Sequence, residues 1–143
     1  MRQRRSSVAF FDRTYNDAVD LLQESRTYFR EHATQELSTL DPTTSMYLSE
    51  EASRVTKRMT EVMTWLLAQK AAHYEQIPRD LLSANTFRLS HDPGLSEDSA
   101  DACEVPLPKR LRDLLNKTHS LYRRVQYLDG QVYGKASVDE RFH

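Results

Sequence analysis

The residues with the most reactive side chains are scattered along the chain. Ser90, His91 and Asp92 are the residue types of a hydrolase triad, but consecutive side chains point apart and nothing beside them builds an oxyanion hole. Cys103 has no basic neighbour to stabilise a thiolate. No pair of histidines has the H-E-x-x-H spacing of a zinc-binding helix; the five are His32, His73, His91, His119 and His143. We therefore expect no catalytic residue, no metal site and no cofactor.

The composition indicates an all-α fold in one domain, residues 1–143. Only 38% of the residues are hydrophobic and 29% are charged, so the core must come from one apolar stripe per element. Leucine dominates the apolar set, whereas strands prefer β-branched and aromatic residues. Glycine occurs only at Gly94, Gly130 and Gly134, so the first 93 residues offer no glycine for a tight hairpin turn. A sheet is therefore not expected.

The first predicted helix covers about residues 7–33. Its inward positions recur at steps of three and four, and they are Val8, Phe11, Tyr15, Ala18, Leu22, Ser25, Phe29 and His32. The outward positions carry no apolar side chain. They include Asp17, Asp20 and Glu24, to which we assign a structural or solubility role rather than acid–base catalysis. The pair Asp41-Pro42 marks the end of this region, because proline disfavours helix in the residue before it.

The second predicted helix covers about residues 44–74. Its inward stripe is Leu48, Ala52, Val55, Met59, Val62 and Leu66. The last third carries further apolar side chains outside that stripe, notably Met63, Trp65, Leu67 and Ala71. Two explanations stay open for this second set: a symmetric dimer or partner contact, or a surface that the following loop covers.

The third predicted helix covers about residues 107–129. Pro106 and Pro108 fit its first turn, and Gly130 is typical of a helix end. Its inward stripe is Leu107, Leu111, Leu114, Thr118, Leu121, Val125 and Leu128. Three such helices can bury one another's stripes in an antiparallel three-helix bundle, followed by a short flexible tail at residues 130–143.

The connection at residues 78–105 is unusually long for a compact domain. Its first part contains Leu81, Leu82, Phe87 and Leu89, which can pack back on the bundle. Residues 91–104 contain five acidic residues and no lysine or arginine, so we expect them to be solvated and mobile. The acidic residues are Asp92, Glu97, Asp98, Asp101 and Glu104. A tolerated insertion and a partner-docking segment are both open interpretations.

A basic stripe flanks the apolar seam of the third helix. Arg110, Lys117 and Arg124 recur every seven residues and therefore share one side of the helix. Such residues usually pair with a neighbouring helix or remain in solvent. The alternative is a face for an acidic protein partner or for nucleic acid.

The chain as a whole carries a formal net charge of −1, which argues against general attraction to nucleic acid or to an anionic membrane. The most apolar window is far shorter than the ~20 residues that cross a bilayer. A single cysteine cannot form an internal disulfide, and the N-terminus shows no signal-peptide pattern. These features predict a cytoplasmic protein without a membrane span.

Several segments resemble the RcdA family, the regulators of CtrA degradation of alphaproteobacteria. The second helix carries SEEASRVTKRM at residues 49–59 and WLLAQKA at residues 65–71. The third helix carries leucines and proline in LPxxLxxLL at residues 107–115, and LYxRVxxLD at residues 121–129. The likeness extends over about residues 10–129.

The resemblance implies a three-helix-bundle homodimer that acts as a non-enzymatic adaptor for the ClpXP protease. It implies binding to the ClpX unfoldase primed by a CpdR-like adaptor, together with protein cargo or a downstream adaptor. It also implies a role in cell-cycle-regulated proteolysis and recruitment to a cell pole. The rival hypothesis is a small DNA-associated regulator that uses the basic face of the third helix, although a helix-turn-helix needs a short turn before its second helix. Nucleic acid is therefore the less favoured partner.

Overall fold

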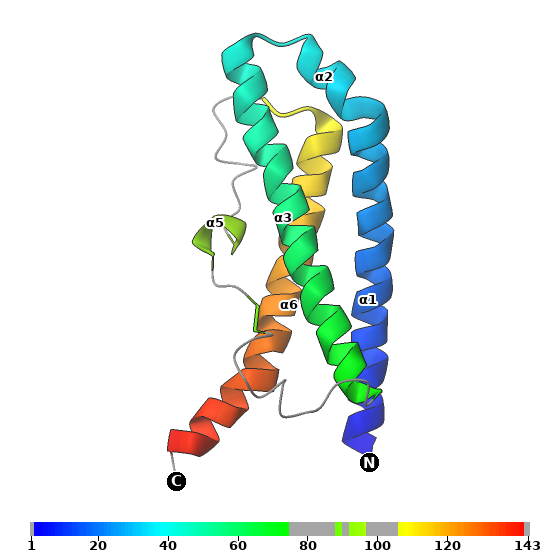
Figure 1. Cartoon of the computed structure of the whole chain (residues 1–143), viewed down its shortest axis with the longest axis vertical. Helices are drawn as coiled ribbons and strands as arrows, with labels where there is room; N and C mark the ends of the chain where they lie inside the picture. Colours follow the sequence, from blue (N-terminus) through cyan, green and yellow to red (C-terminus); the bar gives the residue numbers. More distant parts are fainter. Residues whose placement is uncertain (1, 75–87, 90–91, 97–105, 142–143) are drawn as a thin grey trace.

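The computed structural model describes residues 2–74, 88–89, 92–96 and 106–141, and within these ranges every regular element is a helix (Figure 1). The elements in chain order are α1 (Arg2–Tyr28), a π-helical turn (Phe29–Ala33), α2 (Thr34–Ser38), α3 (Pro42–His73), α5 (Pro93–Ser96) and α6 (Lys109–Arg141). Three long helices, α1, α3 and α6, lie side by side and bury one shared core. The predicted all-α helical bundle is confirmed.

The first helical region is longer than predicted and ends differently. It begins at Arg2, and a π-helical turn carries it past residue 33 to Ser38. The motif Asp41-Pro42 begins α3. The Asp41 carboxylate accepts a hydrogen bond from the Thr44 amide at 3.1 Å. Hydrogen bonding by the Thr44 side chain, together with this amide bond, lowers the pKa of Asp41. Pro42 occupies the first turn, where a backbone N–H would have no acceptor within the helix, so the missing N–H of proline costs nothing.

The buried face of α1 is centred one residue earlier than the predicted stripe. Leu22 is 40% exposed, whereas Leu21 is buried. The side chains that face the core at steps of three and four are Phe11, Thr14, Ala18, Leu21, Ser25 and Tyr28. Thr14 and Ser25 are polar, but the Ser25 hydroxyl donates to the Leu21 carbonyl at 2.8 Å, so its burial leaves no donor unsatisfied.

The predicted stripes of α3 and α6 are confirmed at every position. All six residues of the α3 stripe and all seven of the third-helix stripe, from Leu107 to Leu128, are buried. A second row on α6, which includes Leu115 and Tyr122, is also fully buried. The helix α6 therefore packs against more than one neighbour.

The helix α1 runs antiparallel to α3, as its short connection predicts, but α6 runs parallel to α3 (Figure 1). Two side-chain contacts show this register, because Trp65 meets Asp129 and Gln69 meets Tyr133, each pair 64 residues apart. An α-helix of the length of α3 is about 48 Å long. The connection from α3 to α6 must return over that distance, which gives a physical reason for its length.

The described pieces of this connection are fixed to the α3–α6 face at two levels. The lower level is the carboxylate of Asp129, which is 1% exposed. Its Oδ1 accepts hydrogen bonds from Trp65 Nε1 at 2.9 Å and from the Leu89 amide at 3.0 Å. Its Oδ2 accepts from Arg88 Nη2 at 3.3 Å. One buried carboxylate thus joins α3, α6 and the segment at residues 88–89.

The upper level is the guanidinium of Arg58, which is also 1% exposed. Its Nε donates to the Leu95 carbonyl at 2.8 Å, and its Nη1 donates to the Leu115 carbonyl at 3.0 Å and to Thr118 Oγ1 at 3.2 Å. The side chain of Leu95 is itself buried in the core. The expectation that all of residues 91–104 stay solvated was therefore wrong at α5, because Leu95 offers an apolar anchor that the acidic composition concealed.

The predicted flexible tail was also wrong within the described residues, since α6 continues through Gly130 and Gly134 to Arg141. Glycine inside a helix costs about 1 kcal/mol relative to alanine, which packing can offset. Tyr133 is buried, receives a hydrogen bond from Gln69 Nε2 at 3.2 Å, and lies under the Arg88 guanidinium, 5.5 Å from its ring centre. Burial raises the pKa of Tyr133.

The substitution Asp129→Ala tests the lower level. We expect it to reduce the free energy of unfolding by about 3 kcal/mol, because it leaves the buried indole and the Leu89 amide without their acceptor. Urea denaturation followed by circular dichroism measures this. Asp113→Ala is the matched control on the exposed surface of the same helix and should change stability by less than about 0.5 kcal/mol. Equal effects of the two substitutions would contradict the assigned role of Asp129.

Candidate functional site

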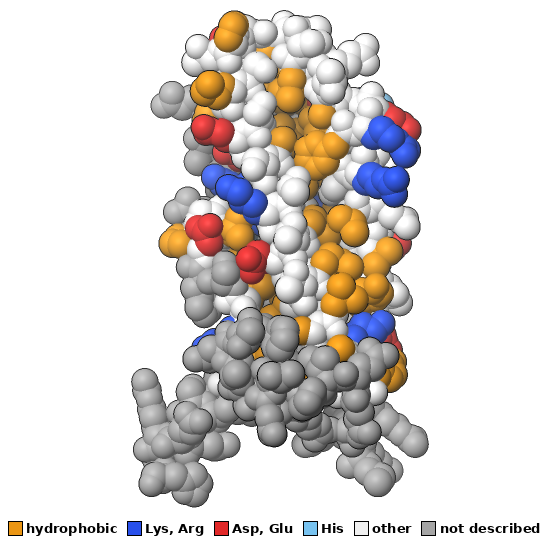
Figure 2. Space-filling view, viewed as in Figure 1, with side chains coloured by type: hydrophobic (Ala, Val, Ile, Leu, Met, Phe, Trp, Pro, Cys, Tyr) orange, Lys and Arg blue, Asp and Glu red, His pale blue; other side chains and the backbone are white. Residues whose placement is uncertain are grey.

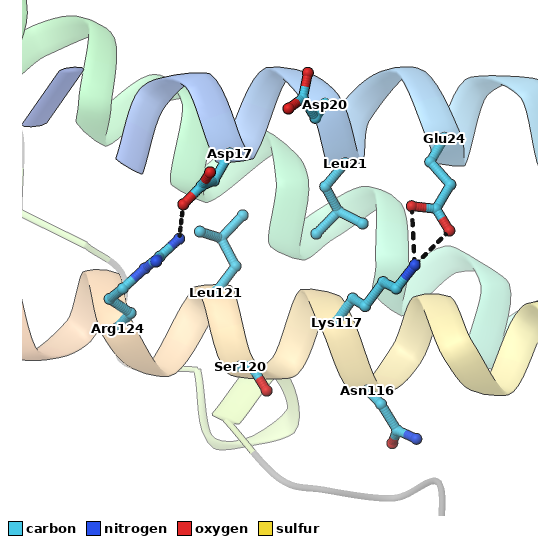
Figure 3. A pocket seen from close by; sticks show the side chains of 9 residues that line it. All are labelled: Asp17, Asp20, Leu21, Glu24, Asn116, Lys117, Ser120, Leu121 and Arg124. Carbon is cyan, nitrogen blue, oxygen red and sulfur yellow. Dashed lines mark hydrogen bonds and ion pairs between the residues drawn. The ribbon is translucent and has the colours of Figure 1, made fainter. Parts of the chain in front are cut away.

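A groove runs between the antiparallel helices α1 and α6, and Figure 3 shows two charged pairs that cross it. Arg124 Nη2 donates to Asp17 Oδ2 at 3.2 Å. One heptad along, Lys117 Nζ donates to both carboxylate oxygens of Glu24, at 2.9 and 3.2 Å. That contact raises the pKa of Lys117. Because the two pairs lie seven residues apart on both helices, they repeat along one line.

A third crossing lies where the π-helical turn meets the start of α6. Arg110 Nη1 lies 3.7 Å from Glu36 Oε1 and 3.2 Å from His32 Nδ1, which accepts from the guanidinium. Glu36 is held from the other side, because the Tyr28 hydroxyl donates to its Oε2 at 2.9 Å. Burial and this hydrogen bond raise the pKa of Tyr28. We call the three crossings Asp17–Arg124, Glu24–Lys117 and Glu36–Arg110 the charged ladder.

The ladder accounts for the predicted basic face. Arg110, Lys117 and Arg124 each have an acidic partner on the α1–α2 side, as expected of basic residues that flank a seam between helices. A duplex-binding surface needs cations that can neutralise phosphates. These three cations are already partly neutralised by carboxylates, so the arrangement does not favour the DNA hypothesis.

Two hollows open between the crossings. The first has a volume of about 600 Å³, and Figure 3 shows Leu21 and Leu121 between the first two crossings. Asp20 lies on its α1 wall, and Asn116 and Ser120 lie on its α6 wall. The second, of about 390 Å³, lies between the Glu24 and Arg110 crossings, and Tyr28, Leu114 and Asp113 are among its lining residues.

A different surface lies on the seam between α1 and α3, where apolar side chains gather (Figure 2). Lys70 Nζ fixes the register, because it lies 3.3 Å from Asp12 Oδ1 and 4.1 Å from the ring centre of Tyr15. Equal steps along the two antiparallel helices bring Leu22 level with Met63. The exposed or half-buried apolar residues of this seam, which we call the apolar strip, are Tyr15, Val19, Leu22, Met63 and Leu67.

The four residues that the sequence predicted as a dimer or partner contact on the second helix differ in exposure. Leu67 is 50% exposed, Met63 and Ala71 are half-buried, and Trp65 is only 2% exposed. Trp65 packs edge-on against Phe11, with ring centres 5.8 Å apart, and donates to Asp129. The assignment of Trp65 to an intermolecular contact was wrong, because its burial is intramolecular.

The predicted acidic segment is described at only one of its five residues. Asp92 is exposed, and its Oδ1 accepts a hydrogen bond from the Gly94 amide at 2.9 Å, just before α5. The other four, Glu97, Asp98, Asp101 and Glu104, lie outside the described residues. Their role as a docking segment stays a prediction.

The sequence did contain a signal for the ladder. Asp17 and Glu24 are spaced by seven residues, as are Lys117 and Arg124, and opposite charges at matched heptad positions favour pairing between antiparallel helices. Asp129 and Arg58 had only weak signals. Each is a charged residue next to an inward position of the predicted stripe. In the sequence alone, such a residue is indistinguishable from an exposed charge beside the seam.

The potential metal ligands of the described residues are dispersed. No group of three or more His, Cys, Asp or Glu side chains in this part of the chain is placed to hold a metal ion. No helix among the described ranges is long and apolar enough to span a bilayer.

Comparison with known proteins identifies a family and a similar solved structure. The family model described as "Protein of unknown function (DUF1465)" matches residues 2–142. The crystal structure of RcdA from Caulobacter crescentus CB15 is similar to this chain with a TM-score of 0.70 and 28% sequence identity. The match covers 86% of this chain and 90% of that one. No curated protein matches the sequence.

The ladder should position the helices more than it stabilises them. A double-mutant cycle with Glu24→Gln and Lys117→Met should give a coupling free energy of roughly 0.2–1 kcal/mol, because the pair is exposed. The coupling should shrink in about 1 M salt, where the Debye length is near 3 Å. Urea denaturation of the four proteins measures it. A coupling above about 2 kcal/mol that resists salt would show that the pair is a structural anchor instead.

Proposed function

This chain belongs to the DUF1465 family, and from its likeness to RcdA we propose that it is a non-enzymatic adaptor that helps deliver protein cargo to the ClpXP protease in cell-cycle-regulated proteolysis. The resemblance predicted from the second and third helices is confirmed by the structural match. The observation that carries the proposal is the extent of that match, which covers 86% of this chain and 90% of RcdA rather than one shared helix.

The physical features of the molecule suit this role. An adaptor needs surfaces and a tether, because the unfoldase supplies the energy for unfolding, and tethering can raise a cargo's effective concentration to about the millimolar range. The α1–α6 groove and the apolar strip are two separate surfaces on one rigid bundle. We propose that ClpX, primed by a CpdR-like adaptor, and protein cargo or a downstream adaptor are the partners. Under this proposal the protein is cytoplasmic and is recruited to a cell pole.

A reconstituted degradation assay tests the proposal. Purified ClpXP, a CpdR-like priming adaptor and candidate cell-cycle cargo proteins are combined with and without this chain, and cargo loss is followed on gels. We expect turnover of at least one cargo to rise by about tenfold when the chain and the priming adaptor are both present, because tethering raises local concentration.

Omission of the priming adaptor is the control, and it should remove most of the gain. Turnover that is unchanged in every combination would sink the adaptor proposal. Binding to duplex DNA that weakens steeply with salt, without any effect on degradation, would favour the rival regulator instead.

We also propose that the chain forms a homodimer through the apolar strip. The strip is supported as an interface by its exposed leucines on two neighbouring helices, Leu22 at 40% and Leu67 at 50% exposure. Apolar side chains that are grouped on a surface, rather than scattered, are typical of protein contacts. A symmetric dimer would bury the same strip on both copies.

The substitution Leu67→Asp should weaken this dimer by about tenfold or more, because it places a charge in a desolvated contact. Met46→Asp is the control: Met46 is 69% exposed on the same helix, about 31 Å away along the axis. Sedimentation equilibrium measures both variants. A monomeric wild-type protein, or equal weakening by both substitutions, would remove the proposed interface.

A further inference from the structure

The two hollows of the α1–α6 groove form one row. The Glu24–Lys117 crossing separates them, and Glu24 lines both. Their apolar lining residues are one heptad apart along each helix, Leu21 and Tyr28 on α1 and Leu121 and Leu114 on α6, so the hollows are about 10.5 Å apart. Leu21 and Leu121 lie in the first hollow, and Tyr28 and Leu114 lie in the second. The groove thus repeats an apolar floor at the spacing of two helical turns.

The walls of the row carry surplus negative charge. All three cations that line the hollows, Arg110, Lys117 and Arg124, already have a carboxylate partner in the ladder. Asp20 on the α1 wall and Asp113 on the α6 wall are exposed, and no ion pair or hydrogen bond joins either carboxylate to another described residue. A ligand that brings positive charge to both walls would therefore be favoured over one that brings negative charge.

The distance between the two hollows fits a helical ligand better than an extended one. In a helix, side chains at positions i and i+7 lie on one face about 10.5 Å apart, which matches the two hollows. In a strand, the same distance is about three residues, and side chains three residues apart point to opposite faces. The floor residues Leu21, Leu121, Tyr28 and Leu114 are buried, between 1% and 8% exposed, so each hollow would receive only the tip of a side chain. Binding should therefore be weak and reversible.

We propose that this row is a docking site for a basic amphipathic helix of a protein partner. The helix places large apolar side chains, seven residues apart, in the two hollows, and its flanking lysines or arginines face Asp20 and Asp113. This deepens the proposed adaptor function, because it names the class of segment by which a partner is held. It uses a different seam from the one that residues 88–89 and 92–96 contact.

The probe is a fluorescein-labelled designed peptide of about 21 residues, long enough to be helical in an alanine-rich background. It carries leucines at positions i and i+7 and lysines beside them. A second peptide has glutamates in place of the lysines, and a third has serines in place of the leucines. Fluorescence anisotropy at about 0.1 M salt should show binding of the lysine peptide, and binding about tenfold weaker or more for each of the other two.

The double variant Asp20→Lys/Asp113→Lys should lose about tenfold or more in affinity for the lysine peptide. The control is the double variant Glu31→Lys/Glu50→Lys. Both of its residues are exposed, and it changes the net charge by the same amount. Circular dichroism establishes that each variant is folded. Methyl resonances of Leu121 should shift on binding, whereas those of Leu67 should not.

Three outcomes would overturn the inference: no binding of the lysine peptide below 1 mM, equal binding of the lysine and glutamate peptides, or equal loss of affinity in the groove and control variants. Methyl shifts confined to the apolar strip would do the same. The binding assay contains no protease, so it is separate from the degradation assay. Peptide binding in the groove without any effect on cargo turnover would sink the adaptor proposal alone, and stimulated turnover with no peptide binding would sink the groove alone.

Discussion

The parallel arrangement of α3 and α6 is the constraint on which the rest of the structure depends, and the buried carboxylate of Asp129 helps to maintain it. A buried charge is costly unless its hydrogen bonds are satisfied. Asp129 satisfies this condition only when the Trp65 indole, the Leu89 amide and the Arg88 guanidinium arrive together. Its burial therefore favours one register of the two helices and one path for the returning chain over alternatives that would leave the charge unpaired.

This constraint decides which seams of the bundle remain available to partners. A three-helix bundle has three seams, and residues 88–89 and 92–96 contact the α3–α6 seam through Asp129, Arg58 and His119, whose ring nitrogen lies 2.8 Å from the Ser96 carbonyl. The two seams that involve α1 differ in character. The α1–α3 seam exposes apolar side chains, whereas charged pairs cross the α1–α6 seam. One fold thus presents two chemically distinct surfaces.

The sequence predicted the seams of α3 and α6 because apolar residues, mostly leucine and valine, recur there at heptad spacing, with Thr118 as the one polar member. It misplaced the face of α1, because the polar Thr14 is buried in the core whereas the apolar Leu22, counted as inward, is 40% exposed. The tail was missed because Gly130 resembles a helix end, while the packing of Tyr133 that supports the longer helix depends on residues far away in sequence. The ladder was predictable as pairing with a neighbouring helix, but its partners were not identified.

The contrast between Asp129 and the ladder shows why burial, rather than charge alone, decides how much a polar contact stabilises the fold. Glu24 and Lys117 approach as closely as Asp129 and Trp65, both at 2.9 Å, but their side chains are about half exposed, so water and salt compete for them. Breaking the exposed pair costs the fold little. A partner can therefore exchange its own charges with those of the ladder without unfolding the bundle, whereas no partner could use Asp129 without displacing the chain that crosses α3 and α6.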